Sequence, residues 1–218
     1  MSLQIDQIAP DFAQDSSEGL IRFYEWAGPS WVVLFSHPKN FTPVCTTELG
    51  AVARLAGEFA RRNVKVIGLS VDRLGDHARW VQDIAETQGA APNYPILADA
   101  DFKVAKLYDM LPAWTGGNAA RRTAAENQTV RNVFIIDPDR KIRLILIYPM
   151  AIGRNFEEIL RAIDALQISD RHRVVTPADW RPGDDVIIQN SVSDEDAKKF
   201  FPKGFETKKP YLRMTPQP

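Results

Sequence analysis

The stretches WVVLFS (residues 31–36) and VKVIGLSV (residues 64–71) are almost continuously apolar and rich in β-branched residues. Such runs are typical of strands that are buried on both faces of a largely parallel sheet. Between them, apolar side chains recur every three or four residues, which predicts an amphipathic helix over residues 43–61. The recurring positions are Cys45, Leu49, Val52, Leu55, Ala56 and Phe59. Together these segments predict a β-α-β unit in an α/β fold with helices on both faces of the sheet.

A hairpin is predicted further along the chain. Residues 130–136 and 141–148 have the composition of strands. The intervening Asp137-Pro138-Asp139-Arg140 has proline at the second position of a β-turn, so we expect these strands to run antiparallel. Parallel and antiparallel strands in one domain predict a mixed central sheet flanked by helices.

Further helices are predicted over residues 77–88 and 101–108, where apolar residues share one helical face. A last helix over residues 156–166 follows Asn155, a residue type that favours the N-cap position. We therefore expect a compact domain that spans residues 1–167.

The remaining segment, residues 168–218, differs in composition. It contains six of the chain's 15 prolines and shows little helical periodicity, and its one clear strand is expected at residues 185–189. Because it is short and rich in proline, we expect a C-terminal extension without a core of its own, lying on its own domain or on a partner subunit.

Composition narrows the classes of function. The chain of 218 residues has 27 basic and 28 acidic side chains and a net charge of -1, which argues against nucleic acid as a partner. Its longest apolar runs are five residues, far short of the roughly 20 of a membrane helix, so we expect no membrane partner. The N-terminal residues lack a basic, then apolar, signal pattern, and we expect a cytoplasmic protein.

The single cysteine, Cys45, cannot form an intramolecular disulfide, which suits a reducing compartment. It is either a small buried apolar residue or a reactive group. Thr42 and Pro43 suit the N-cap and first position of a helix, which places Cys45 in the first helical turn. There, free amides and the helix dipole stabilise a thiolate, and the Thr42 hydroxyl can cap the helix and donate to the sulfur. This loop also leaves the carboxyl end of a predicted strand, where α/β proteins build their sites.

The segment PKNFTPVC, from Pro38 to Cys45, matches the P-x-x-x-T-x-x-C signature of peroxiredoxins, and SHPKNFTPVCTTELG resembles the one-cysteine, peroxiredoxin-6-like branch of the AhpC/TSA family. The resemblance extends over nearly the full length of the chain. Its further stretches are residues 9–12 (APDF), 93–99 (NYPILAD), 131–138 (RNVFIIDP), 148–149 (YP), 153–156 (GRNF) and 209–213 (KPYLR).

The resemblance implies a thioredoxin-like fold and a thiol-dependent peroxidase, an oxidoreductase with a peroxide as acceptor that serves antioxidant defence and redox homeostasis. Cys45 would attack the terminal oxygen of hydrogen peroxide or an organic hydroperoxide and become a sulfenic acid. No cofactor and no metal are implied.

Site residues follow from the same resemblance. Catalytic roles fall to Cys45, Thr42 and Arg131, where the threonine and the arginine hold the peroxide oxygens and the thiolate. Pro38 would shield the sulfur, Glu48 would orient Arg131, and Arg154 and His37 would support the pocket. Without the resemblance, Arg131 could equally lie in solvent at a strand end, and Glu48 could be an ordinary first-turn carboxylate. His77 and His172 are expected on the surface.

The chain has no second cysteine that could resolve a sulfenic acid, so the reductant would be an external thiol or a thioredoxin- or glutaredoxin-like protein. Excess peroxide would oxidise Cys45 further. Because family members are commonly dimers or larger, we expect a homodimer or a higher homo-oligomer in which residues 168–218 are exchanged.

The sequence is also compatible with three other functions. A cysteine hydrolase would pair Cys45 with His37 and form an acyl-enzyme. A disulfide oxidoreductase is disfavoured because Glu48 stands where C-x-x-C requires a second cysteine. A non-enzymatic, chaperone-like oligomer would not need Cys45 at all. Residues 116–127 are expected to form a solvated polar loop.

Overall fold

The computed structural model describes residues 3–112 and 128–218, and the chain divides into two compact units, residues 1–156 and 157–218. The loop predicted over residues 116–127 lies outside the described residues. The strands of the first unit are β1 (Ala13–Ser16), β2 (Gly19–Arg22), β3 (Trp31–Ser36), β4 (Val64–Ser70), β5 (Ile96–Ala98), β6 (Arg131–Ile136) and β7 (Ile142–Tyr148). Its helices are α1 (Phe23–Ala27), α2 (Pro43–Arg54), α3 (Ala56–Arg61), α4 (Leu74–Gln88) and α5 (Lys103–Leu107).

These strands form a seven-stranded sheet in the order β2-β1-β5-β4-β3-β6-β7. Strand β3 pairs in parallel with β4, and β4 in parallel with β5, whereas β6 runs antiparallel to both β3 and β7. The predicted α/β fold with a mixed central sheet is therefore confirmed, including the β-α-β unit and the hairpin.

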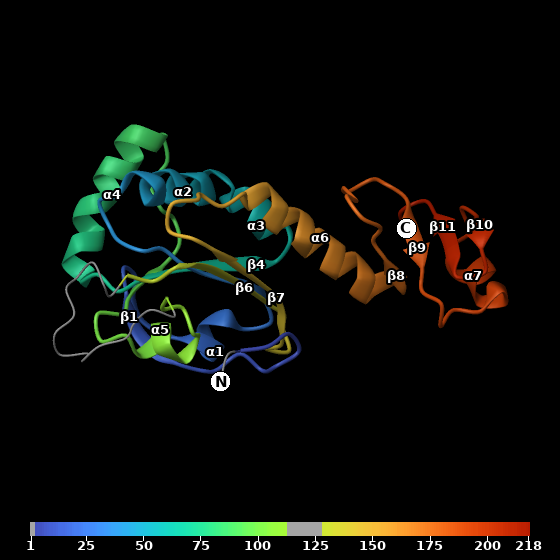
Figure 1. The fold of residues 1–218 in the computed structure, drawn as a ribbon, viewed down its shortest axis with the longest axis horizontal. Helices are drawn as coiled ribbons and strands as arrows, with labels where there is room; N and C mark the ends of the chain where they lie inside the picture. Colours follow the sequence, from blue (N-terminus) through green and yellow to red (C-terminus); the bar gives the residue numbers. More distant parts are fainter. Residues whose placement is uncertain (1–2, 113–127) are drawn as a thin grey trace. The chain divides into compact units, whose positions relative to one another are not determined.

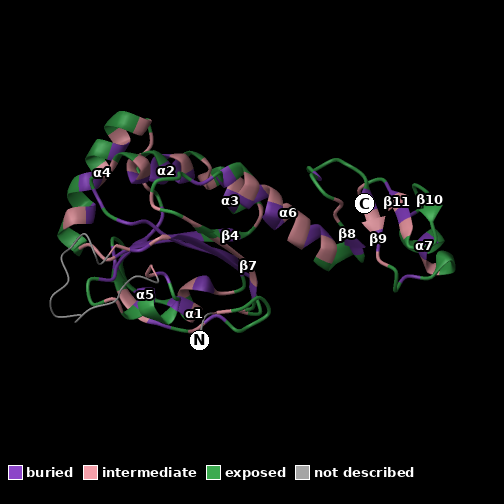
Figure 2. Ribbon diagram, in the orientation of Figure 1, coloured by how far each residue is buried: buried purple, intermediate pink, exposed green. Residues whose placement is uncertain are grey.

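Helices cover both faces of the sheet, with α2 and α4 on one face and α1 and α5 on the other (Figure 1). All six residues of β3 and all six of β6 are buried, as the near-continuous apolar runs require (Figure 2). On the face of α1 and α5, alternate strand residues such as Val32, Leu34 and Phe134 join one core cluster with Phe23 and Tyr108. The opposite face is left for α2, whose N-terminus follows the end of β3.

Local details differ from the sequence-based expectation. The helix expected over residues 43–61 breaks at Leu55, where φ and ψ are -89° and 7°. Both pieces keep apolar residues on the buried side, so periodicity did not reveal the break. The β1–β2 hairpin was not predicted because its strands are four residues each and partly polar, and β5 has only three residues. Gly19 supplies the positive φ, 95°, that the turn of this hairpin requires.

The second unit contains a four-stranded sheet in the order β10-β11-β9-β8. Its elements are β8 (Val174–Val175), β9 (Val186–Ile188), α7 (Asp194–Phe200), β10 (Glu206–Lys209) and β11 (Leu212–Thr215), and it includes α6 (Phe156–His172) from Glu157 onward. The expected strand at residues 185–189 corresponds to β9.

This unit has a core of its own, so the expectation of an extension without one was wrong. Its buried cluster consists of Ile168, Val174, Trp180, Val186, Ile188, Val192, Ala197 and Phe201. The structural division falls after Phe156, the first residue of α6, whereas the sequence predicts it after residue 167. The physical reason is that α6 contributes Ile168 to this cluster and Arg161 donates to the carbonyl of Trp180 at 3.3 Å. Within the described ranges, no helix combines the length and the apolar character needed to cross a bilayer.

Candidate active site

Cys45 lies in the first turn of α2, immediately after the loop that leaves β3. As predicted, Thr42 is the N-cap residue, with an extended backbone, and Pro43 is the first helical residue. The Cys45 side chain is fully buried. The Thr42 hydroxyl makes no cap bond and instead donates to the carbonyl of Lys39 at 2.9 Å. The expected donation from Thr42 to the sulfur is therefore absent from this conformation, because the single hydroxyl proton is used elsewhere.

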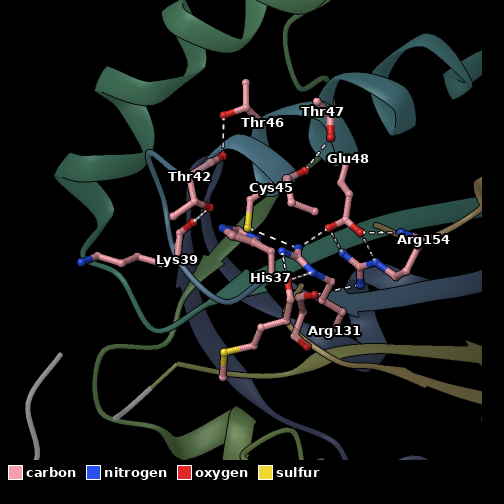
Figure 3. A network of polar contacts seen from close by, with 12 residues as sticks. His37, Lys39, Thr42, Cys45, Thr46, Thr47, Glu48, Arg131 and Arg154 are labelled. Atoms are coloured by element: carbon pink, nitrogen blue, oxygen red, sulfur yellow. Dashed lines mark hydrogen bonds and ion pairs between the residues drawn. The ribbon is translucent and has the colours of Figure 1, made fainter. Parts of the chain in front are cut away.

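Arg131, the first residue of β6, contacts the sulfur directly. Its Nη1 donates to Cys45 Sγ at 3.3 Å and to Glu48 Oε2 at 2.7 Å. Its Nε and Nη2 donate to the carbonyl of Met150 at 2.9 and 2.7 Å (Figure 3). The guanidinium is 3% exposed, so the alternative of a solvated arginine at a strand end is wrong. Four hydrogen bonds to three groups hold this donor against the position of a thiolate.

Glu48 lies between two arginines. Besides Arg131, it accepts from the Arg154 backbone amide at 2.8 Å, from Nε at 2.9 Å and from Nη2 at 2.7 Å. Arg154 Nη1 in turn donates to the carbonyls of Ser36 and Asn132 at 2.8 and 2.9 Å. Both guanidinium groups and the carboxylate are buried. Two cations and one anion leave an excess positive charge beside the sulfur.

His37 and Pro38 are also buried and begin the loop that precedes Cys45. Burial lowers the pKa of the His37 imidazole to about 3, opposed by the hydrogen bond from its Nε2 to Asn40 Oδ1 at 2.9 Å. The ring is therefore neutral at physiological pH. Among the described residues, no hydrogen bond joins His37 to Cys45, so the Cys-His pair of a hydrolase is not formed here.

His77 was expected on the surface, and this expectation was wrong. Its ring is fully buried, and Nδ1 lies 2.9 Å from Asn40 Nδ2. The sequence did contain a signal, because His77, Trp80 and Ile84 are spaced along one face of α4 and all three are buried. Asn40 was missed as well, and only the tertiary structure brings it between the two histidines. His172 is exposed, as expected.

The structure thus brings Cys45, Glu48, Arg131 and Arg154 into one polar network, with Thr42 beside it (Figure 3). Pro38 lies in the loop between β3 and α2. These positions come from the ends of β3 and β6, the first turns of α2 and the segment before α6. A buried cysteine against a fixed guanidinium is suited to attack on an electrophile that leaves an anion.

Comparison with known proteins places this site in a family. The AhpC/TSA family model matches residues 5–145, and a model for the C-terminal domain of 1-Cys peroxiredoxin matches residues 165–204. The chain is 52% identical over 216 residues to the 1-Cys peroxiredoxin of Dictyostelium discoideum, covering 99% of this chain and 86% of that protein.

Solved structures agree. Peroxiredoxin 6 of Arenicola marina, crystallised as a cysteine-to-serine mutant, is similar with a TM-score of 0.91 at 44% identity, covering 100% of this chain and 99% of that one. The yeast mitochondrial 1-Cys peroxiredoxin gives a TM-score of 0.87 at 50% identity, covering 98% and 99% of the two chains. The chain therefore belongs to the AhpC/TSA family, in its one-cysteine peroxiredoxin branch, and is a thiol-dependent peroxidase with a thioredoxin-like fold.

Proposed function

We propose that the chain reduces hydrogen peroxide and organic hydroperoxides in a cycle that passes through a Cys45 sulfenic acid. The Sγ thiolate attacks the terminal oxygen of the hydroperoxide, an S–O bond forms and the O–O bond breaks. The departing oxygen takes a proton and leaves as water or an alcohol. The observation that supports this proposal most directly is the 3.3 Å contact from Arg131 Nη1 to Cys45 Sγ, fixed by Glu48 and Met150.

The roles proposed for the other residues follow from their placement. Arg131 donates first to the sulfur and then to the oxygen that accumulates negative charge during attack. Thr42 acts once its hydroxyl rotates from the Lys39 carbonyl toward the bound peroxide. Glu48 and Arg154 keep Arg131 in place, and the buried Pro38 shields the sulfur.

The sulfenic acid is returned to the thiol by an external reductant, because the chain has one cysteine. A small thiol or a thioredoxin- or glutaredoxin-like protein fits this role. The similar yeast mitochondrial protein has its thiol resolved via the glutathione and thioredoxin systems. Since Cys45 is fully buried, the first turn of α2 must unfold locally before a small thiol or a protein reductant can reach its sulfur.

We also propose a homodimer or higher homo-oligomer and a cytoplasmic location. Strand β7 is an edge strand of the sheet, and Ile147 on it is 65% exposed. The backbone N–H and C=O of Ile142 pair with Gln7 and Asp6, but no other strand of the described residues pairs with the outer edge of β7, and an apolar edge of this kind favours pairing with a second copy. The single free cysteine suits a reducing compartment. A monomeric mass in solution, unchanged by Ile147→Lys, would contradict the oligomer.

Rapid mixing of the reduced protein with stoichiometric hydrogen peroxide tests the peroxidase reaction. We expect a fast change in fluorescence of the five tryptophans and a product heavier by about 16 or 32 mass units. Both signals are expected to be absent from a Cys45→Ser control. Equal inertness of the two proteins, or an acyl-enzyme with esters, would overturn the proposal.

A further inference from the structure

The loop before Cys45 contains a second buried polar network, separate from the arginines. The amide of Asn40 lies between two histidine rings, with Oδ1 2.9 Å from His37 Nε2 and Nδ2 2.9 Å from His77 Nδ1. Asn40 is 2% exposed and both rings are fully buried. Its backbone amide donates to Asp72 Oδ2 at 2.7 Å, so Asn40 is held from the backbone and the side chain at once.

The chemistry of an amide dictates the protonation of both rings. An amide oxygen only accepts and an amide nitrogen only donates. His37 Nε2 must therefore have the proton, and His77 Nδ1 must be a bare acceptor. His37 Nδ1 is buried and has no hydrogen-bond partner among the described residues. A bare lone pair there costs less than an orphaned N–H, which agrees with the same assignment.

A charged imidazole has N–H groups on both nitrogens and fits neither position. On His77 the second N–H would oppose the amide of Asn40, and on His37 it would be buried without an acceptor. The carbonyl of Leu97 favours a proton on the His77 ring, although within residues 3–112 and 128–218 no acceptor lies in hydrogen-bond geometry with Nε2. Because Nδ1 is bare, that proton belongs on Nε2.

The charged surroundings act on the two rings in different ways. His37 faces His77, Arg154 and Arg131, and all three add to burial in lowering its pKa. His77 faces the carboxylates of Asp72 and Asp76, which raise its pKa, but burial is the larger effect and the pKa is lowered overall.

We propose that Asn40 is a positioning residue for the peroxidase reaction, because its amide fixes His37 and His77 as neutral tautomers with the proton on Nε2. The two rings consequently add no positive charge to the pocket around Cys45 when the pH falls. A protonated histidine would be a third cation near Arg131, and it would shift the balance between the hydrogen bonds that Arg131 donates to Sγ and to Glu48. This inference rests on the proposed function but concerns a different group of residues.

The first test needs no variant. Long-range ¹H–¹⁵N NMR of the full-length protein distinguishes the two neutral tautomers and the imidazolium of each of its three histidines, with the exposed His172 as an internal reference. We expect His37 and His77 to remain neutral with the proton on Nε2 through about pH 6.5, where a free imidazole titrates. Protons on Nδ1, or an imidazolium at that pH, would overturn the proposal.

The second test replaces the amide by a carboxylate of the same shape. In Asn40→Asp both oxygens accept, so His77 should move its proton to Nδ1 and one ring should titrate near pH 6.5. The second-order rate constant for hydrogen peroxide should then change by about fivefold across that titration. The wild type and Asn93→Asp, which adds the same charge at an exposed position, should show no such inflection.

Superimposable pH profiles of Asn40→Asp and Asn93→Asp would contradict the inference. If Asn40→Asp did not fold, the tautomers of the wild type would still decide. The two proposals can be told apart, since an inert wild type with the expected tautomers would refute the peroxidase reaction, whereas the fixing of both tautomers by Asn40 would stand. Normal peroxide reduction with reversed tautomers would refute the role of Asn40 alone.

Discussion

Two buried polar networks contact the segment around Cys45, and they differ in charge. One consists of Glu48, Arg131 and Arg154, and the other of His37, Asn40 and His77. The first is charged and gives each charge several partners. The second avoids charge altogether, since burial lowers the pKa of both histidines. The comparison shows that ionised groups are buried where negative charge must be stabilised, whereas neutral groups are used where the loop must only be held.

Removing the shared carboxylate should have the largest effect. Glu48→Gln leaves Arg131 and Arg154 buried beside one another without a counterion, so we expect the free energy of unfolding to fall by about 3–5 kcal/mol. Denaturant unfolding measures this change. Glu86→Gln, on the exposed face of α4, is the matched control and should change it by less than about 0.5 kcal/mol. Equal effects would mean that the charged network is not what stabilises the site.

Changing the donor but keeping its charge should affect the reaction next. Arg131→Lys retains a cation but cannot bond Sγ, Glu48 and the Met150 carbonyl together. We expect the rate constant for hydrogen peroxide to fall by about 10²–10³. Arg143→Lys on β7 is the matched control and should lower it less than about twofold. A loss of less than about twofold in Arg131→Lys as well would show that charge alone, and not geometry, is required.

The neutral network of His37, Asn40 and His77 should affect how the free energy of unfolding depends on pH. His37 has a pKa of about 3 when folded and about 6.5 when unfolded, so the unfolded chain binds the extra proton first as the pH falls. Above about pH 6.5 His37 is neutral in both states and does not lower the free energy of unfolding. Below that pH the free energy of unfolding falls progressively, by about 2 kcal/mol at pH 5.

Unfolding free energies at pH 7 and pH 5, compared between the wild type and His37→Gln, measure this difference. The comparison between variants is needed because Asp99, whose pKa burial raises to about 6, contributes in the opposite direction. An identical pH dependence in both proteins would show that His37 is not neutral when folded.

The smallest effect is expected where α2 meets α4. Thr46 Oγ1 donates to the Thr42 carbonyl at 2.8 Å and accepts from Trp80 Nε1 at 3.2 Å. Thr46→Val should cost about 1 kcal/mol of unfolding free energy. Thr47→Val, on the exposed side of the same turn, should cost less because only its bond to the Val44 carbonyl is lost. A reversed order would argue against a link between the two helices.

Much of the fold could be predicted because apolar periodicity reports burial directly. The β3–α2–β4 unit and the β6–β7 hairpin were predicted from such runs and one turn signature. The β1–β2 hairpin and the second core were not predicted. Short polar strands and scattered apolar residues such as Trp180 show no local periodicity, and they are ordered only by long-range packing.

The site divides in the same way. The sequence by itself determined that one cysteine stands in the first turn of a helix after a buried strand, because Thr42 and Pro43 mark the helix start and the strand is encoded by local apolar residues. Only the tertiary structure decided which charged side chains lie beside Cys45. Arg131 is 86 positions from Cys45, Arg154 is 106 positions from Glu48, and Asn40 reaches a histidine 37 positions away. The physical reason is that such contacts depend on strand register and helix packing, which no local pattern specifies.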